Sequence, residues 1–421
     1  MHHFHYRNNA LFCEEVSVSQ IAENVGTPFY LYSHATLKRH FRAFDDAFGE
    51  MKHLTCFSMK SNSNLAVLRL IAREGGGADI VSGGELFRAL RAGIEPERIV
   101  YSGVGKRAED MEYALKSGIL LFNVESTQEI SLLNEVAERQ GKKARIALRV
   151  NPDVDPRTHP YISTGLKENK FGIDIRKALE VYRTAAGLSH LKISGVSCHI
   201  GSQLTEVRPF VDALRRVKSL IDELQHRDIR IDYLDLGGGL GITYEKEVPP
   251  HPGEYAKAVK SEMNMRDLIL ILEPGRVIMG NAGILVARVL YTKSAEDKHF
   301  IIVDAAMNDL VRPSLYGSYH GIQPVMIRGH EKIQADIVGP ICESGDFLAK
   351  DREVEGFEPG ELMAVMSAGA YGFSMSSNYN SRPKVAEVMV KGRDYEVIRA
   401  RETYEDLIRG EKIPDFLEKT P

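Results

Sequence analysis

The sequence predicts an α/β protein, with a TIM-type (β/α)8 barrel followed by a mainly antiparallel β domain. Short β-rich runs alternate with helix-like stretches over roughly 230 residues, which fits eight strand–helix units. Several of these runs are apolar throughout, as parallel strands buried on both faces are. Beyond about residue 281 the helix-like stretches become rare. An open, doubly wound sheet stays the alternative, because a strand count does not show that a sheet closes.

The barrel strands are expected where β-branched and apolar residues cluster between polar or glycine turns. In chain order these runs are residues 54–58, 78–81, 98–101, 119–124, 145–150, 193–198, 231–236 and 268–272. Residues 64–73 and 84–92 carry apolar side chains at spacings of three and four, which is typical of one helix face. Residues 126–139 open with Ser126-Thr127-Gln128-Glu129, a capping-box pattern that predicts a helix N-terminus.

Strand-like runs also dominate the rest of the chain. They are residues 284–291, 300–303, 324–327, 333–338 and 362–365, and then 385–390 and 395–399 around the hairpin turn Lys391-Gly392-Arg393-Asp394. We therefore expect the barrel domain at residues 28–280 and the β domain at residues 281–421. The first 27 residues are expected to pack on the β domain, with an added barrel strand as the alternative.

Composition excludes several classes of protein. The 421 residues are 43% apolar and 27% charged, which is typical of a folded globular protein. The net charge of −4 argues against broad nucleic-acid binding, which needs a basic surface. No apolar run approaches the roughly 18 residues of a membrane span. The four cysteines have neither zinc-site nor disulfide-framework spacing, so we expect a cytoplasmic protein without a metal site.

The residues that follow the predicted strands are polar or glycine, as a barrel active site requires at that end. Lys60 follows the first strand. A lysine at the end of an apolar strand is partly desolvated, which lowers its pKa and makes the amine nucleophilic toward an aldehyde. A lysine that merely extends to solvent is the equally open alternative.

The run Gly237-Gly238-Gly239 follows the seventh strand. Three glycines let the backbone approach a ligand closely and direct N–H groups at a phosphate, although a simple tight turn would have the same sequence. The run lacks the dinucleotide-binding spacing, and the stretch from Gly103 to Arg107 lacks the residues of a P-loop. A phosphorylated cofactor is therefore favoured over ATP or NAD.

Glu273 ends the very apolar eighth run, where a carboxylate needs a partner. In a purely structural role, the Glu273 carboxylate would pair with Arg276. In a functional role, it would pair with a protonated ring nitrogen. His199 directly follows the sixth run, where it is either a structural histidine or a flat ring for stacking. A reactive lysine, a phosphate cradle, an acid and an imidazole together describe a site for pyridoxal phosphate (PLP).

These residues lie in motifs that resemble the diaminopimelate decarboxylase family, PLP-dependent decarboxylases of the alanine-racemase-like fold. The resemblance runs from Thr27-Pro28-Phe29-Tyr30 to Lys384. Its motifs are Phe57-Ser58-Met59-Lys60-Ser61-Asn62, His159-Pro160-Tyr161-Ile162-Ser163-Thr164-Gly165, Lys170-Phe171-Gly172-Ile173, His199-Ile200-Gly201-Ser202-Gln203, Gly237-Gly238-Gly239-Leu240-Gly241, Glu273-Pro274-Gly275-Arg276, Met307-Asn308-Asp309, Arg312-Pro313-Ser314-Leu315-Tyr316, Cys342-Glu343-Ser344-Gly345-Asp346 and Gly369-Ala370-Tyr371-Gly372. The family usually has alanine where Ser61 stands, a small change that should be tolerated.

The resemblance implies a set of cofactor contacts. Lys60 would hold PLP as a Schiff base, His199 would stack on its ring, and Glu273 would pair with its ring nitrogen. The implied cofactor-binding residues are Lys60, Asp79, His199, Ser202, Gly238, Gly239, Glu273, Gly275, Arg276 and Tyr371.

The resemblance also implies the reaction, the decarboxylation of meso-2,6-diaminopimelate to L-lysine and CO2 as the last step of lysine biosynthesis. Lys60 and Cys342 would be catalytic, with Cys342 supplying a proton after CO2 leaves. Arg276, Arg312, Tyr316, Glu343 and Tyr371 would bind the substrate. A homodimer would share its active sites, because Cys342 and Glu343 would reach into the neighbouring subunit.

The substrate assignment has a physical reason, because the distal end of diaminopimelate keeps a carboxylate and an ammonium. Arginine offers a bidentate fork to the first, and Glu343 offers an anion to the second. Lysine and ornithine lack the distal carboxylate and would leave the arginines unpaired.

Four other functions stay open. An amino-acid racemase of the same fold would usually place an arginine, and not Glu273, at the ring nitrogen. A decarboxylase of another diamino acid or of a carboxylated polyamine would not need both arginines. A non-catalytic PLP-binding protein would have no use for the β domain. A metal-dependent barrel hydrolase would need histidine and aspartate at several strand ends, where the sequence has only His199.

Overall fold

The computed structural model of the protein describes residues 2–154, 170–263, 268–295 and 298–418. The chain divides into two compact units. Unit 1 comprises Ala35–Ala282, and unit 2 comprises His2–His34 and Gly283–Pro421.

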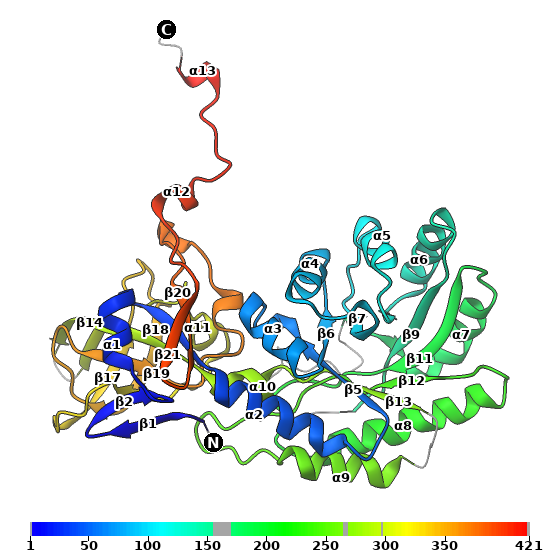
Figure 1. The fold of residues 1–421 in the computed structure, drawn as a ribbon, viewed down its shortest axis with the longest axis horizontal. Helices are drawn as coiled ribbons and strands as arrows, with labels where there is room; N and C mark the ends of the chain where they lie inside the picture. Colours follow the sequence, from blue (N-terminus) through cyan, green and yellow to red (C-terminus); the bar gives the residue numbers. More distant parts are fainter. Residues whose placement is uncertain (1, 155–169, 264–267, 296–297, 419–421) are drawn as a thin grey trace. The chain divides into compact units, whose positions relative to one another are not determined.

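Unit 1 is built on a closed parallel barrel (Figure 1). Its eight strands are β5 (His53–Ser58), β6 (Gly77–Ile80), β7 (Ile99–Tyr101), β8 (Leu121–Val124), β9 (Ala144–Asn151), β11 (Leu191–Ser197), β12 (Tyr233–Asp235) and β13 (Ile269–Leu272). Each strand pairs in parallel with the next, and β13 pairs with β5 to close the ring. The short β10 (Ile173–Asp174) adds to β9. The predicted barrel is confirmed, and the open-sheet alternative is excluded.

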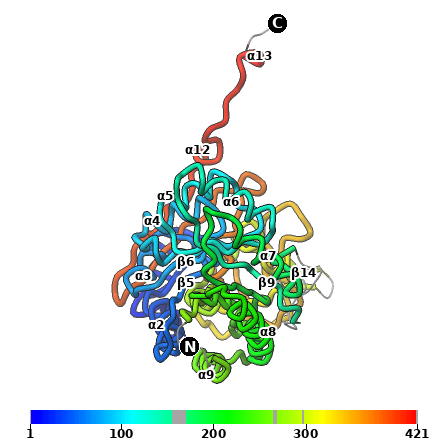
Figure 2. Tube along the Cα trace, turned by 90° about the vertical axis from the view of Figure 1, so that its right-hand side faces the viewer, coloured from blue at the N-terminus to red at the C-terminus, as the bar shows by residue number. Residues whose placement is uncertain are grey.

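Helices lie outside the strands, as Figure 2 shows around β5, β6 and β9. They are α2 (His34–Asp45), α3 (Leu65–Arg73), α4 (Gly83–Ala92), α5 (Ala108–Ser117), α6 (Thr127–Arg139), α7 (Ala178–Ala186), α8 (Arg208–Gln225), α9 (Pro252–Glu262) and α10 (Arg276–Met279). Each of them buries apolar or small residues on one side, as Val67, Leu68 and Ile71 do on α3. No helix of the described residues is both long enough and apolar enough to cross a membrane.

The N-terminus of α6 differs from the capping box that the sequence predicts. The Ser126 hydroxyl accepts a hydrogen bond from Glu129 N, as expected. The Glu129 carboxylate does not return to Ser126, because it accepts from Glu125 N at 2.9 Å and from Lys106 Nζ at 2.7 Å. The carboxylate thus joins the backbone N–H of the residue before the N-cap to a buried ammonium.

The barrel interior has an apolar layer and, beyond it, a polar layer. Side chains two residues apart on a strand share one face. The apolar layer includes Cys56, Val100, Leu121, Ala147 and Ile271. The residues two positions further along the same strands are Ser58, Ser102, Asn123, Arg149 and Glu273. The polar layer therefore lies at the carboxyl ends of the strands, where barrel active sites are built.

Unit 2 has a mainly antiparallel sheet of order β18-β17-β15-β14-β4-β20-β21, with β16 and β19 beside it. Its strands are β4 (Phe29–Ser33), β14 (Gly283–Ala295), β15 (Lys298–Val303), β16 (Ile322–Pro324), β17 (Lys332–Val338), β18 (Phe347–Glu355), β19 (Leu362–Val365), β20 (Ala386–Lys391) and β21 (Asp394–Arg399). The β20–β21 hairpin is present as the sequence predicts. The remaining helices are α1 (Val18–Val25), α11 (Arg312–Tyr316), α12 (Tyr404–Leu407) and α13 (Asp415–Glu418).

Two strands of unit 2 depart from the sequence prediction. The strand β18 was not predicted, because charged residues fill its exposed middle positions. The strand β4 pairs with β14 and β20 and is buried at every position, so it belongs to this sheet and not to the barrel. The predicted barrel domain starts at residue 28, whereas unit 1 starts at Ala35.

The N-terminal residues are part of unit 2. The strands β1 (Phe4–Arg7), β2 (Ala10–Cys13) and β3 (Val16–Ser17) form a small sheet of their own. Leu11, Val16 and Ile21 pack into the same apolar core as Ile284 and Val388. The segment therefore covers the unit 2 sheet and adds no strand to the barrel.

Candidate active site

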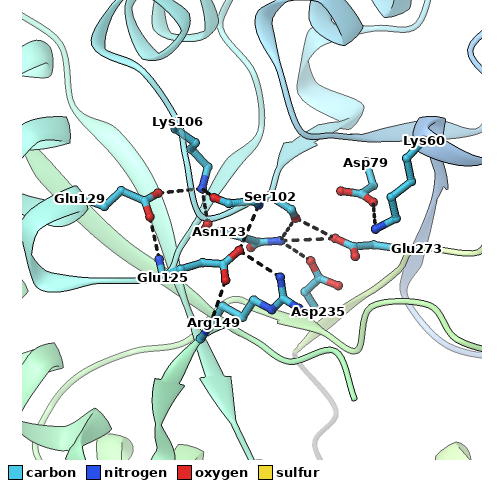
Figure 3. A network of polar contacts seen from close by, with 12 residues as sticks. Lys60, Asp79, Ser102, Lys106, Asn123, Glu125, Glu129, Arg149, Asp235 and Glu273 are labelled. Carbon is cyan, nitrogen blue, oxygen red and sulfur yellow. Dashed lines mark hydrogen bonds and ion pairs between the residues drawn. The ribbon is translucent and has the colours of Figure 1, made fainter. Parts of the chain in front are cut away.

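The polar layer of the barrel brings Lys60 and Asp79 together (Figure 3). Lys60 lies in a short 3-10 turn directly after β5, and its Nζ is 3.7 Å from Asp79 Oδ2. Ser58 donates a hydrogen bond to the same oxygen at 2.8 Å. The other oxygen, Asp79 Oδ1, is buried and has no hydrogen-bond partner among the described residues. The lysine side chain is 42% exposed, so its amine is accessible at the open end of the barrel.

Glu273 is buried beside a second carboxyl group, Asp235. Ser102 Oγ lies 3.3 Å from Glu273 Oε1, and Asn123 Nδ2 lies 3.4 Å from it. Burial raises the pKa of Glu273 well above its ordinary value, and the carboxylates of Asp235 and Asp79 raise it further. Glu273 is therefore a neutral acid until a cation faces it.

The His199 ring is neutral and held in one orientation. Burial lowers the pKa of its imidazole well below the ordinary value, and the positive charges of Lys60 and Arg149 lower it further. His199 Nδ1 lies 3.2 Å from Gly238 N, which donates to it, so we assign the single N–H proton of the neutral ring to Nε2. A neutral, flat imidazole can stack on an aromatic ring without adding charge.

Gly238 and Gly239 lie where a side chain has no room. A Cβ at Gly238 would lie 2.1 Å from Glu273 O, and one at Gly239 would lie 2.4 Å from Gly201 O. Gly239 also has φ +119°, which other residues rarely adopt. Gln203 fixes this loop to the preceding one, since it bonds Ile242 N and Ile242 O.

Arg276 connects the first turn of α10 to the loop after β11. Its guanidinium donates to Ser202 Oγ at 3.0 Å and to Tyr244 Oη at 2.7 Å. Gly275 precedes it, and a Cβ there would lie 3.1 Å from Ser58 Cβ. Ser202, Gly275 and Arg276 are thus gathered at one side of the strand ends.

A second buried network lies on the other side of Asn123 (Figure 3). Lys106 Nζ bonds Glu129 and the carbonyl oxygens of Asn123 and Gly103. Arg149 donates to Glu125 Oε1 at 2.9 Å, and Glu125 also accepts from Gly103 N and Gly172 N. Ser102, Lys106 and Glu125 follow predicted strands, but sequence reasoning gave them no role, and it did not single out Asn123, Arg149 or Asp235. The two-residue period of the strands could have found Ser102, Asn123, Arg149 and Asp235.

The remaining predicted residues lie in unit 2. Arg312 is buried, and its guanidinium lies 3.2 Å from His320 Nε2 and 3.2 Å from Ser318 Oγ. Tyr316 ends the same short helix.

Cys342 and Glu343 are both exposed. Tyr379 and Asn380 bind these two residues. Tyr379 Oη donates to Glu343 Oε2 at 2.7 Å, and Asn380 Oδ1 accepts from Cys342 N at 3.0 Å. Tyr371 adopts φ +56°, a strained conformation for a residue other than glycine. The predicted motif at residues 159–165 lies outside the described residues.

The barrel residues fit PLP. An accessible lysine amine lies beside a buried carboxylate oxygen that lacks a partner, and a flat neutral imidazole lies near a buried acid. The glycine turn brings its backbone close to the neighbouring turns, because a Cβ at Gly238 or Gly239 would meet a carbonyl oxygen. Lys60, Glu273 and His199 are thus brought together with Ser202 and Arg276 in one unit.

Comparisons with known proteins identify the family. The family described as "Pyridoxal-dependent decarboxylase, pyridoxal binding domain" matches residues 34–280. The chain is 55% identical to the diaminopimelate decarboxylase of Pseudomonas aeruginosa over 410 residues, which cover 97% of this chain and 99% of that protein.

Two solved structures are similar over nearly their whole length. Diaminopimelate decarboxylase from Helicobacter pylori, complexed with L-lysine, has a TM-score of 0.90 at 45% identity, with 93% of this chain and 98% of that chain covered. Diaminopimelate decarboxylase from M. jannaschii, in co-complex with L-lysine, has a TM-score of 0.94 at 37% identity, with 98% of both chains covered. The chain therefore belongs to the diaminopimelate decarboxylase family of pyridoxal-dependent decarboxylases.

Proposed function

We infer that the protein uses PLP to decarboxylate meso-2,6-diaminopimelate to L-lysine and CO2. The observation that carries this inference is the 55% identity to a diaminopimelate decarboxylase over 97% of the chain. The geometry of the barrel agrees with it, because Lys60, His199 and Glu273 lie together at the strand ends. Lysine would then be the last product of its biosynthetic route.

Residues of the barrel would hold the cofactor. Lys60 would bind it covalently, His199 would stack on its ring, and Glu273 would face its ring nitrogen. The phosphate would be bound by Ser202 and the backbone of Gly239, Gly275 and Arg276, with Tyr371 of unit 2 added. Gly238 would act through His199, since its N–H already donates to the imidazole.

When bound, PLP accepts the electron pair that remains on the substrate after CO2 leaves. Glu273 would support that role by pairing with a protonated ring nitrogen. Arginine at this place would keep the nitrogen unprotonated, so the acidic residue favours a decarboxylase over a racemase. The Cys342 thiol would hold the proton that replaces the lost carboxylate at Cα.

Arginine and glutamate side chains would recognise the distal end of the substrate. Arg312 is kept oriented by His320 and Ser318, which supports a role in binding a carboxylate bidentately. Glu343 is held by Tyr379 and would bind the ammonium. Arg276 and Tyr316 would complete the contacts to the substrate, together with Tyr371.

The working form would be a homodimer with shared active sites. Cys342 and Glu343 are exposed on the single chain, so both are accessible to a second copy. We place the enzyme in the cytoplasm, and the four free cysteines support a reducing compartment.

The test is to measure CO2 and lysine release from the purified, PLP-loaded protein. The substrates are meso-diaminopimelate and, in parallel, ornithine, arginine and lysine. We expect release from diaminopimelate alone. Release mainly from another amino acid would overturn the roles of Arg312 and Glu343, and racemisation without CO2 would overturn the reaction.

A further inference from the structure

The Asp235 carboxyl group lies beside Glu273 in the polar layer and takes no part in the proposed cofactor contacts. Asp235 ends β12, is 0% exposed and is bonded to Asn123, which also contacts Glu273 (Figure 3). Two carboxyl groups this close in a buried site cannot both be ionised without a large electrostatic cost. They therefore share a proton, and the hydrogen bonds show which of the two is the anion.

Asp235 is the better-stabilised anion of the pair. Its Oδ1 accepts from Gly237 N at 2.8 Å, and its Oδ2 accepts from Asn123 Nδ2 at 2.7 Å. Both of its oxygens thus receive short bonds from fixed donors. Hydrogen bonds to the charged form of a carboxylate favour that form.

Glu273 receives the weaker interactions. Asn123 Nδ2 carries two hydrogens but lies near three oxygens, at 2.7 Å from Asp235, 3.0 Å from Ser102 and 3.4 Å from Glu273. Ser102 Oγ is 3.3 Å from Glu273 Oε1 and is itself bonded by Asn123. The opposite amide orientation would place Asn123 Oδ1 at 2.7 Å from the anionic Asp235 Oδ2 with no hydrogen between them, so Nδ2 faces Asp235.

We propose that Asp235 is a positioning residue for Glu273, and that the pair holds one proton which Glu273 gives to the ring nitrogen of PLP as the cofactor binds. In that step the O–H bond of Glu273 breaks and an N–H bond forms. No other reactant is needed. Asp235 then adds a second buried negative charge beside the cationic ring nitrogen and keeps it protonated.

The other groups around the pair do not replace Asp235. Asp79 and Lys60 are the charged neighbours, and they lie 3.7 Å from each other as an ion pair. Cys56, Cys198 and Tyr255 also interact with the pair, but burial raises the pKa of each of them, so they stay neutral. The inference rests on the proposed function for the presence of PLP beside Glu273.

The first experiment compares the wild-type protein with Glu273→Gln. Infrared difference spectra at pH 8, between cofactor-free and PLP-loaded enzyme labelled with ¹³C at the glutamate carboxyls, report protonated glutamates. We expect one protonated glutamate to be lost when PLP binds, and no such loss in Glu273→Gln. A difference spectrum without that loss overturns the proposal.

The second experiment tests Asp235 with Asp235→Asn, which keeps the shape but removes the charge. PLP affinity should fall at least tenfold, and in the cofactor-free enzyme the protonated glutamate should be lost at a lower pH. The matched control is Asp336→Asn, a buried aspartate of β17 that is paired with Lys298, and it should leave PLP affinity unchanged.

The outcomes separate the two inferences. Unchanged PLP affinity and unchanged glutamate titration in Asp235→Asn, in a protein whose wild type decarboxylates diaminopimelate, overturn the role of Asp235 alone. A wild-type protein that does not bind PLP overturns both this inference and the proposed function.

Discussion

The protonation states of Glu273 and His199 depend on the groups that surround them. Glu273 and Asp79 are both acids of the polar layer, but Asp79 pairs with Lys60 and Glu273 has a carboxylate for its neighbour. Burial lowers the pKa of His199 and so removes a charge that would repel a cationic ring nitrogen. The sequence located Glu273 and His199 at strand ends, whereas their protonation depends on partners from other strands.

Cys342→Ala tests the proton donor. We expect PLP to stay bound and turnover to fall by about 10²–10⁴-fold, the usual loss when a general acid is removed. Steady-state kinetics and the absorbance of bound PLP measure the two effects separately. Turnover at the wild-type level in this variant would show that another group supplies the proton.

Asp309→Asn tests a buried carboxyl group outside the proposed site. Burial raises the pKa of Asp309 from 3.8 to about 7, so the folded protein binds this proton more tightly than the unfolded chain does. The stability that the group contributes is therefore lost as the pH rises from about 4 to 7, by roughly 3–4 kcal/mol. Asparagine can still accept from Ala306 N and does not titrate.

The measurement is the free energy of unfolding of both proteins between pH 5 and pH 8. The free energy of unfolding of Asp309→Asn should increase relative to that of the wild type as the pH rises. Leu310 is a buried apolar neighbour, and Leu310→Ala is the control. It should lower the free energy of unfolding by the same amount at every pH. A constant difference between Asp309→Asn and the wild type would contradict a raised pKa.

At the scale of the elements, the strand ends and the turns after them carry the chemistry. The two-residue period of the strands predicts which residues share the interior face, and it accounts for the polar layer above Cys56, Val100 and Ile271. The turn after β12 needs glycine because the backbone of the neighbouring turns approaches closely. The helices were located by their spacing, but the partner of Glu129 at the start of α6 came from another strand end.

Gly239→Ala tests the glycine turn. The added methyl group would lie 2.4 Å from Gly201 O in a backbone conformation that alanine rarely adopts, so the loop must shift. A strain of about 1–3 kcal/mol should lower PLP affinity by about five- to a hundredfold. Gly105→Ala, in the loop after β7 with open space around it, is the matched control. Equal PLP affinities in the two variants, measured by PLP titration, would show that this turn has no role in binding the cofactor.

At the scale of the whole molecule, the residues to which the proposed function gives roles belong to both units. The barrel supplies Lys60 and Glu273, and unit 2 supplies Arg312, Cys342 and Glu343. Cys342 and Glu343 would act in the active site of a second copy. The dimer would then be a requirement of the chemistry and not only of stability.

Subunit exchange tests that proposal. Lys60→Ala and Cys342→Ala proteins should each be nearly inactive, and mixing them should restore about a quarter of the wild-type activity, since random exchange places half of the chains in mixed dimers with one intact site each. Activity is followed together with a tag-based assay of exchange. Proven exchange without recovered activity would show that the sites are not shared.

Local patterns in the sequence determined the alternation of strands and helices in the barrel and the change to mostly strands after it. They also determined the positions of Lys60, His199 and Glu273 at strand ends. Hydrophobic periodicity and turn chemistry are local properties, so they can be read along the chain. Barrel closure, the place of β4 in the unit 2 sheet and the pairing of Asp235 with Asn123 depended on contacts between segments far apart in the sequence. Such contacts are set by packing and by the burial of polar groups in three dimensions, which no local pattern records.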